Sequence, residues 1–216
     1  MTREPRAEAC GTSGTEEDVI APELWQRLRA FDTDDVVTRS LASITEDGCY
    51  RLPMLGSHVV VDAAAEAVSP AWPDVIRPDY FLWVSVVQYL LSVRDIPLAG
   101  ELVPVTKLPY GEVFFRGPHA LPGDALGAIF GSDGDWFREV MFRLGAENAD
   151  LGEVGARVSV FPRLPIWLGF WAADDEFPAR VTFLFDYSAG DHLPVDALWS
   201  AVMVLAGAVR RLAASH

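Results

Sequence analysis

The chain has 216 residues, of which half are hydrophobic and 22% are charged, and this balance is ordinary for a globular protein with one sizeable core. Its 31 acidic and 17 basic side chains give an acidic protein with a formal net charge of −14, and the sequence has no run of lysines or arginines. Non-specific binding to nucleic acid or to anionic membranes needs a basic surface, so we expect neither as a partner.

The beginning of the chain differs in composition from the rest. Residues 1–19 are polar, small and aperiodic, so we expect a disordered tail followed by a single domain over residues 20–216. The tail has charges but no apolar segment of the signal-peptide kind. The two cysteines, Cys10 and Cys49, are too few and too far apart for a disulfide scaffold, a zinc site or an iron–sulfur site. We therefore expect a cytoplasmic protein.

The first third of the chain predicts two helices and a hairpin. A helix begins at Pro22, since proline is favoured in a first turn. Asp32-Thr33-Asp34-Asp35 reads as a break and an N-cap for a second helix. Residues 49–54 and 57–62 flank a Leu-Gly pair, which indicates a β-hairpin. Residues 63–78 form a variable stretch without a predicted element.

The middle of the chain predicts a buried helix and two further helices. Residues 79–94 leave almost no polar face, and a helix of this kind is buried on most sides, so we expect it at the centre of the fold beneath the sheet. Its apolar part is too short to span a bilayer. Residues 101–108 read as extended. Residues 121–130 and 136–144 read as helices, and a glycine-rich link over residues 145–155 follows them.

Three apolar runs between Arg157 and Asp186 predict a three-stranded antiparallel meander. Pro162 and Pro165 are expected to interrupt the ladder before the second run, Ile166 to Trp171. This run has almost no polar side chain and should be covered on both faces. Helix is the competing interpretation of that run, but it is short and bounded by prolines. In the third run Val181, Phe183 and Phe185 share one face, and Arg180, Thr182 and Asp186 share the other.

A last helix is predicted after Leu193-Pro194. The fold class expected from these elements is α+β, with helices packed on one face of a mainly antiparallel sheet that includes the C-terminal meander. On the outer face of the meander, Arg180 is expected either to brace the strands by pairing with a carboxylate or to bind an anionic group of a ligand.

Several short segments of the chain carry a resemblance to a known family: Tyr89-Leu90-Leu91 with 97–101, Leu164-Pro165, 174–179, and 184–186 with Leu193-Pro194. In these segments the chain resembles an uncharacterised domain-of-unknown-function family of anaerobic bacteria and archaea. Some family members are joined to corrinoid-type iron–sulfur modules, which implies a link to tetrapyrrole or corrinoid metabolism. This chain lacks the clustered cysteines of those modules.

The acidic tip between the last two strands, Asp174-Asp175-Glu176, is the candidate metal site. Hard cations need several oxygens that converge on one point, and three consecutive side chains rarely do so. The structural interpretation is a solvated turn in which one acid accepts hydrogen bonds from backbone N–H groups.

Four further residues are candidate ligand-binding residues. His119 and Arg116 flank a Gly-Pro turn where an anion or the edge of a tetrapyrrole could lie, and Arg180 and His192 are the other two. For each histidine the alternative is a structural or exposed side chain. Ser188 to His192 contains serine, aspartate and histidine but lacks the nucleophile elbow of serine hydrolases.

These features favour a non-catalytic ligand-binding or accessory protein. Its partner would be a hydrophobic or anionic small molecule, with a tetrapyrrole or corrinoid as the candidate that the resemblance implies, or another protein. The alternative is a metal-dependent enzyme that uses the acidic tip with Asp186 and His192. The sequence decides neither whether the protein is an enzyme nor which cofactor it holds.

Overall fold

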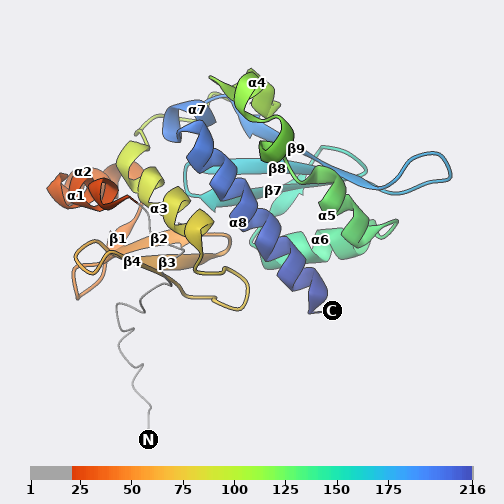
Figure 1. The fold of residues 1–216 in the computed structure, drawn as a ribbon. Coiled ribbons are helices and arrows are strands. Elements are labelled where there is room, and N and C mark those ends of the chain that lie inside the picture. The colour runs from red at the N-terminus through yellow and green to blue at the C-terminus, as the bar shows by residue number, and fades with distance from the viewer. Residues whose placement is uncertain (1–20, 216) are drawn as a thin grey trace, which may run out of the picture.

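Two antiparallel sheets form the frame of the molecule in the computed structural model, which describes residues 21–215 (Figure 1). The prediction of a disordered tail over residues 1–19 falls outside the described residues. The first sheet has the order β1-β2-β3-β4 and the second β5-β9-β8-β7-β6. The α+β class and the antiparallel C-terminal meander are confirmed, whereas the sequence predicted one sheet and did not separate the two.

The elements have the following bounds. The strands are β1 Ser43–Ile44, β2 Tyr50–Met54, β3 Ser57–Asp62, β4 Ala67–Pro70, β5 Leu102–Val103, β6 Glu147–Ala149, β7 Val154–Phe161, β8 Leu164–Trp171 and β9 Arg180–Asp186. The helices are α1 Pro22–Ala30, α2 Thr33–Ser40, α3 Tyr80–Ser92, α4 Gly111–Phe114, α5 Gly123–Phe130, α6 Gly134–Arg143, α7 Ala189–His192 and α8 Val195–Ala214, and the 3₁₀ turns are η2 Val105–Lys107 and η3 Gly117–His119.

Side-chain caps begin two of the N-terminal helices. Asp32 Oδ1 accepts hydrogen bonds from the N–H groups of Asp34 at 2.8 Å and Asp35 at 3.3 Å, as the sequence predicted for α2. Asp79 Oδ1 accepts one from the N–H of Leu82 at 3.1 Å and begins α3.

The predicted hairpin is the centre of the first sheet. Leu55 and Gly56 both have positive φ, which is the backbone of the two-residue turns that match the twist of a hairpin. The stretch over residues 63–78, for which no element was predicted, contains β4, and the link over residues 145–155 contains β6. Both predictions were wrong because strands of three or four residues are too short to show a period of two.

Buried and less buried residues alternate in β9 as predicted, but the middle strand of the meander begins earlier than predicted. Strand β8 begins at Leu164, and Pro165 lies within it opposite Ser159. The predicted interruption before Ile166 is therefore wrong. The register between β7 and β8 shifts between Ser159 and Phe161, and such an irregularity is where a ladder tolerates the missing N–H of a proline.

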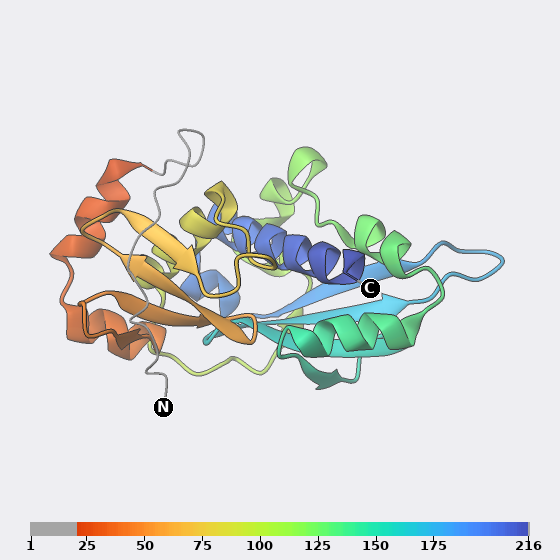
Figure 2. The same cartoon turned by 90° about the horizontal axis from the view of Figure 1, so that it is seen from below.

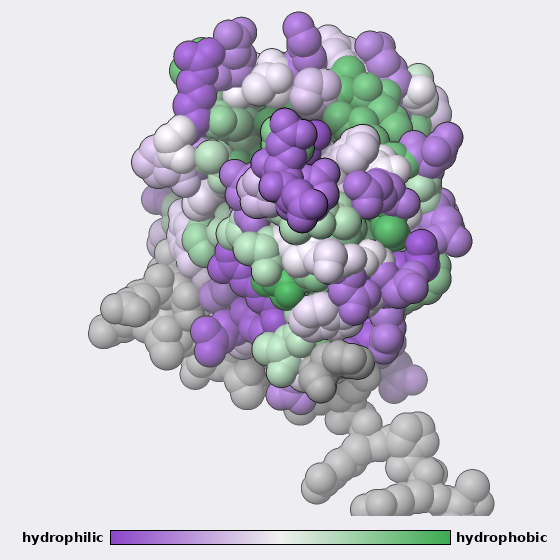
Figure 3. All heavy atoms as spheres, turned by 90° about the vertical axis from the view of Figure 1, so that its right-hand side faces the viewer, coloured by the Kyte–Doolittle hydropathy of each residue, from purple (hydrophilic) through white to green (hydrophobic). Residues whose placement is uncertain are grey.

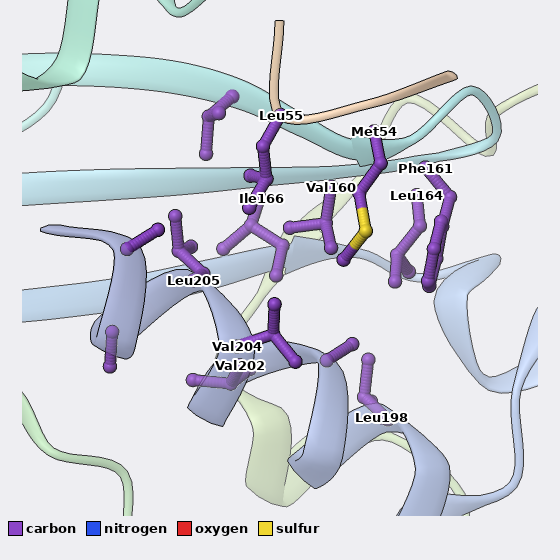
Figure 4. Close-up of a cluster of buried hydrophobic side chains, with 14 of the residues drawn as sticks. Met54, Leu55, Val160, Phe161, Leu164, Ile166, Leu198, Val202, Val204 and Leu205 are labelled. Atoms are coloured by element: carbon purple, nitrogen blue, oxygen red, sulfur yellow. The ribbon is translucent and has the colours of Figure 1, made fainter. Parts of the chain in front are cut away.

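One face of the meander packs against α8, which crosses it diagonally (Figures 1 and 2). Figure 4 shows Ile166 of β8, Val202 of α8 and Met54 of β2 pointing into the same apolar cluster, and all three are buried. The opposite face is only partly covered, because Trp167 is half-buried and Trp171 is exposed. The expectation that residues 166–171 are covered on both faces was therefore wrong.

Helix α3 lies beside α8 and also contacts α1, α2 and β4, so it is central but belongs to a helical layer. Helix α8 is the one helix among the described residues that is long and apolar enough to span a membrane. However, 67% of the most apolar 18-residue stretch of α8 is buried inside the structure, as in a helix of a protein core. A cytoplasmic location stays a prediction.

The two sheets meet where the β2–β3 turn lies against β7. The N–H of Leu55 donates a hydrogen bond to the carbonyl oxygen of Ser159 at 3.2 Å. Beside this contact, a Cβ atom on Gly56 would lie 2.9 Å from the backbone nitrogen of Gly145, so the close approach of these two segments needs glycine.

Candidate functional site

The loop between β8 and β9, residues 172–179, protrudes from the sheet in both ribbon views (Figures 1 and 2). Figure 3 looks onto this end of the molecule and shows hydrophilic side chains on its most prominent part with hydrophobic side chains around them. A cavity of about 390 Å³ lies against the loop. Its lining residues are Asp124, Glu153, Trp171, Ala172, Asp174, Phe177, Pro178 and Arg180.

Strand register places an arginine on a tryptophan at the base of the loop. Trp171 is the last residue of β8 and Arg180 the first of β9, and the two are directly opposite each other. The Arg180 guanidinium lies over the Trp171 ring, 5.4 Å from its centroid. The arginine–carboxylate pair expected across the strands occurs instead between Arg157 and Glu147, whose Nη1 and Oε2 atoms are 3.1 Å apart. Within residues 21–215 Arg180 forms no ion pair, so its guanidinium is available to a ligand in the cavity.

Asp174 organises the turn of the loop. Its Oδ1 accepts hydrogen bonds from the N–H groups of Glu176 at 2.8 Å and Phe177 at 2.7 Å. These two bonds, the one from Phe177 foremost, lower the pKa of Asp174 below its ordinary value because they stabilise the carboxylate. The structural interpretation of the acidic tip, in which one acid holds the turn, describes this geometry.

The metal interpretation gains no support from the arrangement of the tip. Asp175 and Glu176 do not line the cavity beside Asp174. Within residues 21–215, no three histidine, cysteine, aspartate or glutamate side chains gather in a way that would hold a metal ion. A metal at Asp174, Asp175 and Glu176 stays a prediction.

Two exposed aromatic side chains give the cavity its apolar character. Phe177 is 63% exposed and Trp171 is 37% exposed, although both are large and apolar. Large apolar side chains that gather at one concave place mark binding surfaces more often than chance exposure does. Sequence reasoning did not select Phe177 as a site residue. The feature that could have identified it is its position in a turn, directly after three acidic residues.

Helix α5 supports the loop from behind and brings Asp124 to the cavity. A Cβ atom on Gly127 would lie 2.4 Å from the carbonyl oxygen of Ala179, so the helix lies directly on the chain where β9 begins. At the other end of the loop, the N–H of Ala173 donates to the carbonyl oxygen of Gly131, just after α5, at 3.0 Å. The loop is therefore fixed at both ends.

Asp186 lies at the opposite end of β9 and has a structural role. Its buried carboxylate accepts hydrogen bonds from the N–H groups of Ala99 and Gly100, each at 2.8 Å, and from the N–H and hydroxyl of Ser188 at 3.0 and 2.6 Å. Burial raises the pKa of Asp186, but these four bonds together outweigh it, so that the net pKa is below the ordinary value. The carboxylate joins the segment before β5 to the end of β9.

His192, in α7, is fully buried near Asp186. Its Nδ1 accepts a hydrogen bond from the N–H of Arg94 at 3.4 Å, so Nε2 carries the ring proton, and it has no hydrogen-bond partner in the part of the chain that the structure describes. Burial and the positive charge of Arg163 lower the pKa of His192, and the imidazole is neutral at pH 7.

The residues of the predicted enzyme alternative do not come together. Asp186 and Arg180 are six residues apart on one extended strand, a separation of about 20 Å. The acidic tip adjoins Arg180, and His192 follows Asp186 closely. The tip and His192 therefore lie at opposite ends of β9.

Arg116 and His119 lie in neither of these two regions but in the segment around η3. Arg116 is exposed and pairs with Glu112 across one helical turn, with Nη2 and Oε1 2.9 Å apart. His119 stacks on Phe114 with ring centroids 4.4 Å apart, and its edge meets Trp199 at 5.0 Å. Neither residue lines the cavity. Of the predicted ligand-binding residues, only Arg180 does so, together with Asp174 from the predicted metal set.

A second cavity of about 430 Å³ lies where the two sheets meet. Leu41, Met54, Leu55, Phe161 and two prolines contribute to its lining, and no charged side chain does. We consider the smaller cavity at the β8–β9 loop the better candidate because apolar walls and charged groups meet there, as they do in small-molecule sites.

The sequence was compared with protein families, curated proteins and solved structures. It matches the family described as Domain of unknown function (DUF3786) over residues 32–208, which is more than half of the chain and includes the whole β8–β9 loop. The comparisons with curated proteins and with solved structures found no match. The protein therefore belongs to the DUF3786 family, whose domain has no assigned function.

Proposed function

We propose that the protein is a non-catalytic ligand-binding or accessory protein and that the cavity at the β8–β9 loop is its binding site. The observation that carries this proposal is the exposure of Phe177 and Trp171 on the wall of a cavity of about 390 Å³. Small-molecule sites have volumes of about 300–1,000 Å³, apolar walls and a few charged or polar groups that orient the ligand. Arg180 and the carboxylates of Asp124 and Glu153 are such groups.

The side chains around the cavity favour a flat conjugated ligand with hydrogen-bond donors at its edge. The aromatic rings of Phe177 and Trp171 offer stacking surfaces. The carboxylates of Asp124 and Glu153 outnumber the one arginine in the lining, so a ligand with several carboxylates of its own would be repelled. Neutral amide groups, in contrast, donate hydrogen bonds to carboxylates.

This balance favours a corrinoid, whose side chains are largely neutral amides, over a tetrapyrrole that carries propionates. The cavity takes one edge of such a macrocycle, and the remainder extends over the exposed loop. Binding to another protein, the other expectation from the sequence, stays a prediction.

The metal-dependent enzyme is the weaker proposal. It needs the acidic tip and His192 to act on one substrate, and β9 separates them by its full length. His192 is also fully buried, so a substrate would have to open the structure to reach it.

Equilibrium dialysis of the purified protein against hydroxocobalamin tests the proposal, with protoporphyrin IX as the anionic comparison and an absorption spectrum taken first to detect a bound chromophore. We expect saturable binding of the corrinoid, weaker binding of the porphyrin, and a loss of about tenfold or more in corrinoid affinity for Phe177→Ala. Phe142→Ala is the matched control, because Phe142 is an exposed phenylalanine on α6 that does not line the cavity. Absence of corrinoid binding, or equal loss in both variants, would contradict the proposal.

A further inference from the structure

The turn that carries Phe177 is closed by one residue, Asp174. The side-chain Oδ1 of Asp174 accepts from the N–H groups of Glu176 and Phe177, and its own N–H donates to the carbonyl oxygen of Phe177 at 3.0 Å. Three hydrogen bonds thus connect the first residue of this four-residue turn with its last two. The backbone of Phe177 is held at a fixed position relative to the start of the loop.

The rest of the loop is held from outside the turn. The N–H of Ala173 donates to the carbonyl oxygen of Gly131, and Gly127 of α5 lies against Ala179. The loop projects from the sheet, but its backbone is anchored before and after the turn. A phenyl ring on such a backbone loses less conformational entropy when a ligand orders it than a ring on a free loop does.

We propose that Asp174 is the positioning residue of the candidate site, which holds Phe177 in place as the aromatic wall against which a flat conjugated ring stacks. This inference rests on the proposed function. It assigns the role of Asp174 to the acceptor oxygen of its side chain. Its negative charge is not what the site uses, and neither a metal ion nor a cationic group of the ligand is its partner.

A role of the acceptor oxygen of Asp174 and a role of its negative charge predict opposite effects of the substitution Asp174→Asn. The amide oxygen of asparagine accepts hydrogen bonds as the carboxylate oxygen does, but the side chain has no charge. Asp174→Asn therefore keeps the turn and removes the charge, whereas Asp174→Ala removes both. Asp175→Ala is the matched control, because it removes the neighbouring charge from a residue that does not line the cavity.

Two measurements on the full-length chain test the inference. Hydrogen exchange of the Glu176 and Phe177 amides, followed by NMR without ligand, reports on the turn. We expect exchange about tenfold or more faster in Asp174→Ala, and rates within about twofold of the original protein in Asp174→Asn and Asp175→Ala. Equilibrium dialysis against hydroxocobalamin reports on binding and should rank the variants in the same order.

A double variant tests whether Asp174 acts through Phe177. If it does, Asp174→Ala combined with Phe177→Ala binds hydroxocobalamin no more weakly than Phe177→Ala alone, because the group being positioned is already gone. Additive losses would overturn the inference, and so would a loss in Asp174→Asn as large as that in Asp174→Ala. If the original protein binds no corrinoid, the proposed function fails and with it the role in binding. Unchanged exchange in Asp174→Ala would instead show that the positioning itself is wrong.

Discussion

Arg163 Nε donates a hydrogen bond to the carbonyl oxygen of Arg39 at 2.7 Å, between residues that are 124 positions apart in the chain. Arg163 lies in the β7–β8 turn and Arg39 near the end of α2. The same guanidinium donates to the carbonyl oxygen of Ile96 at 3.3 Å and pairs with Asp95, while Arg39 Nη1 donates to the carbonyl oxygen of Val93 at 2.6 Å. These two arginines therefore join the meander, α2 and the end of α3.

Replacement of Arg163 by methionine should lower the free energy of unfolding by about 2–4 kcal/mol, because two partly buried carbonyl oxygens and one carboxylate lose a charged donor. Urea unfolding followed by circular dichroism measures this change. Arg116→Met is the control, since the ion pair of Arg116 with Glu112 in the described part of the chain is exposed and worth about 0.5 kcal/mol or less. Equal effects of the two substitutions would show that the contacts of Arg163 contribute little.

Replacement of Arg180 by methionine separates its two possible roles. Arg180 is exposed and contacts the Trp171 ring, a contact worth about 0.5–1 kcal/mol at such a site, so the stability loss should stay within that range. Hydroxocobalamin binding in equilibrium dialysis should weaken several-fold, because a donor in the cavity lining is lost.

Arg157→Met is the matched control, since Arg157 lies over Trp167 at 5.3 Å in the same sheet but does not line the cavity. This variant should lose a comparable amount of stability and keep the affinity for the corrinoid. A stability loss in Arg180→Met without any change in affinity would support a purely structural role.

Acidification should weaken the fold through His192. The pKa of His192 in the folded protein is lowered, so the unfolded chain binds a proton more readily than the folded one. Stability from this residue is present above about pH 6.5, the ordinary pKa of histidine, and is lost as the pH falls from there toward the folded pKa. The lowered pKa of Asp186 acts separately and at lower pH, where its carboxylate becomes protonated.

His192→Asn should reduce the pH dependence of stability in this range, because asparagine offers an acceptor for the N–H of Arg94 and does not titrate. Urea unfolding at several values between pH 7 and pH 5 gives the slope for both proteins. An unchanged slope in the variant would show that another group is responsible.

Substitution of Gly127 by alanine should destabilise the fold, although alanine is normally favoured over glycine in a helix by about 1 kcal/mol. The new methyl group would lie 2.4 Å from the carbonyl oxygen of Ala179 and 2.5 Å from the backbone nitrogen of Arg180, so α5 and β9 must separate. We expect a loss of about 1–3 kcal/mol in thermal or urea unfolding, with weaker corrinoid binding.

Gly207→Ala is the matched control in α8. There the nearest atom to a new Cβ is Arg211 Nη1 at 3.0 Å, a side-chain atom that also donates to the carbonyl oxygen of Val75 at 2.8 Å. A shift of a few tenths of an ångström relieves this contact without moving any backbone, so the substitution should cost clearly less than Gly127→Ala. Equal responses of the two glycine sites would mean that the close packing of α5 on the loop does not limit stability.

Sequence reasoning found the elements whose pattern is local. The meander was predictable because Val181, Phe183 and Phe185 alternate with polar residues over a full strand, and the cap at Asp32 because its acceptor acts within three residues. Strands β4 and β6 were missed because they are short, and they exist because neighbouring strands pair with them. The start of β8 was missed because the rule against proline in strands gives way where the register shifts.

The same distinction holds for the candidate site. Asp174 was predicted because it belongs to a run of three acids in a turn, and Arg180 because it lies on the polar face of a strand with a period of two. Asp124 lines the cavity from α5 and Glu153 lines it from the segment before β7. Neither was predicted, because no spacing in the sequence indicates that these segments meet. Trp171 was assigned to a covered strand because an apolar run does not show which of its faces lacks a partner layer.

The strand order has a consequence for how the protein folds as it is synthesised. The first sheet uses strands that lie between Ser43 and Pro70, and each pairs with a neighbour in the chain. In the second sheet Leu102 pairs with Asp186, so this edge waits for 84 further residues, and the covering helix α8 ends at Ala214. Long-range pairings of this kind form slowly, and during translation the N-terminal sheet can assemble first. Helices α5 and α6, which contact the same strands, are made before the meander, but the part of its apolar face that packs on α8 stays open until α8 leaves the ribosome. An apolar surface exposed in this way favours aggregation of the nascent chain.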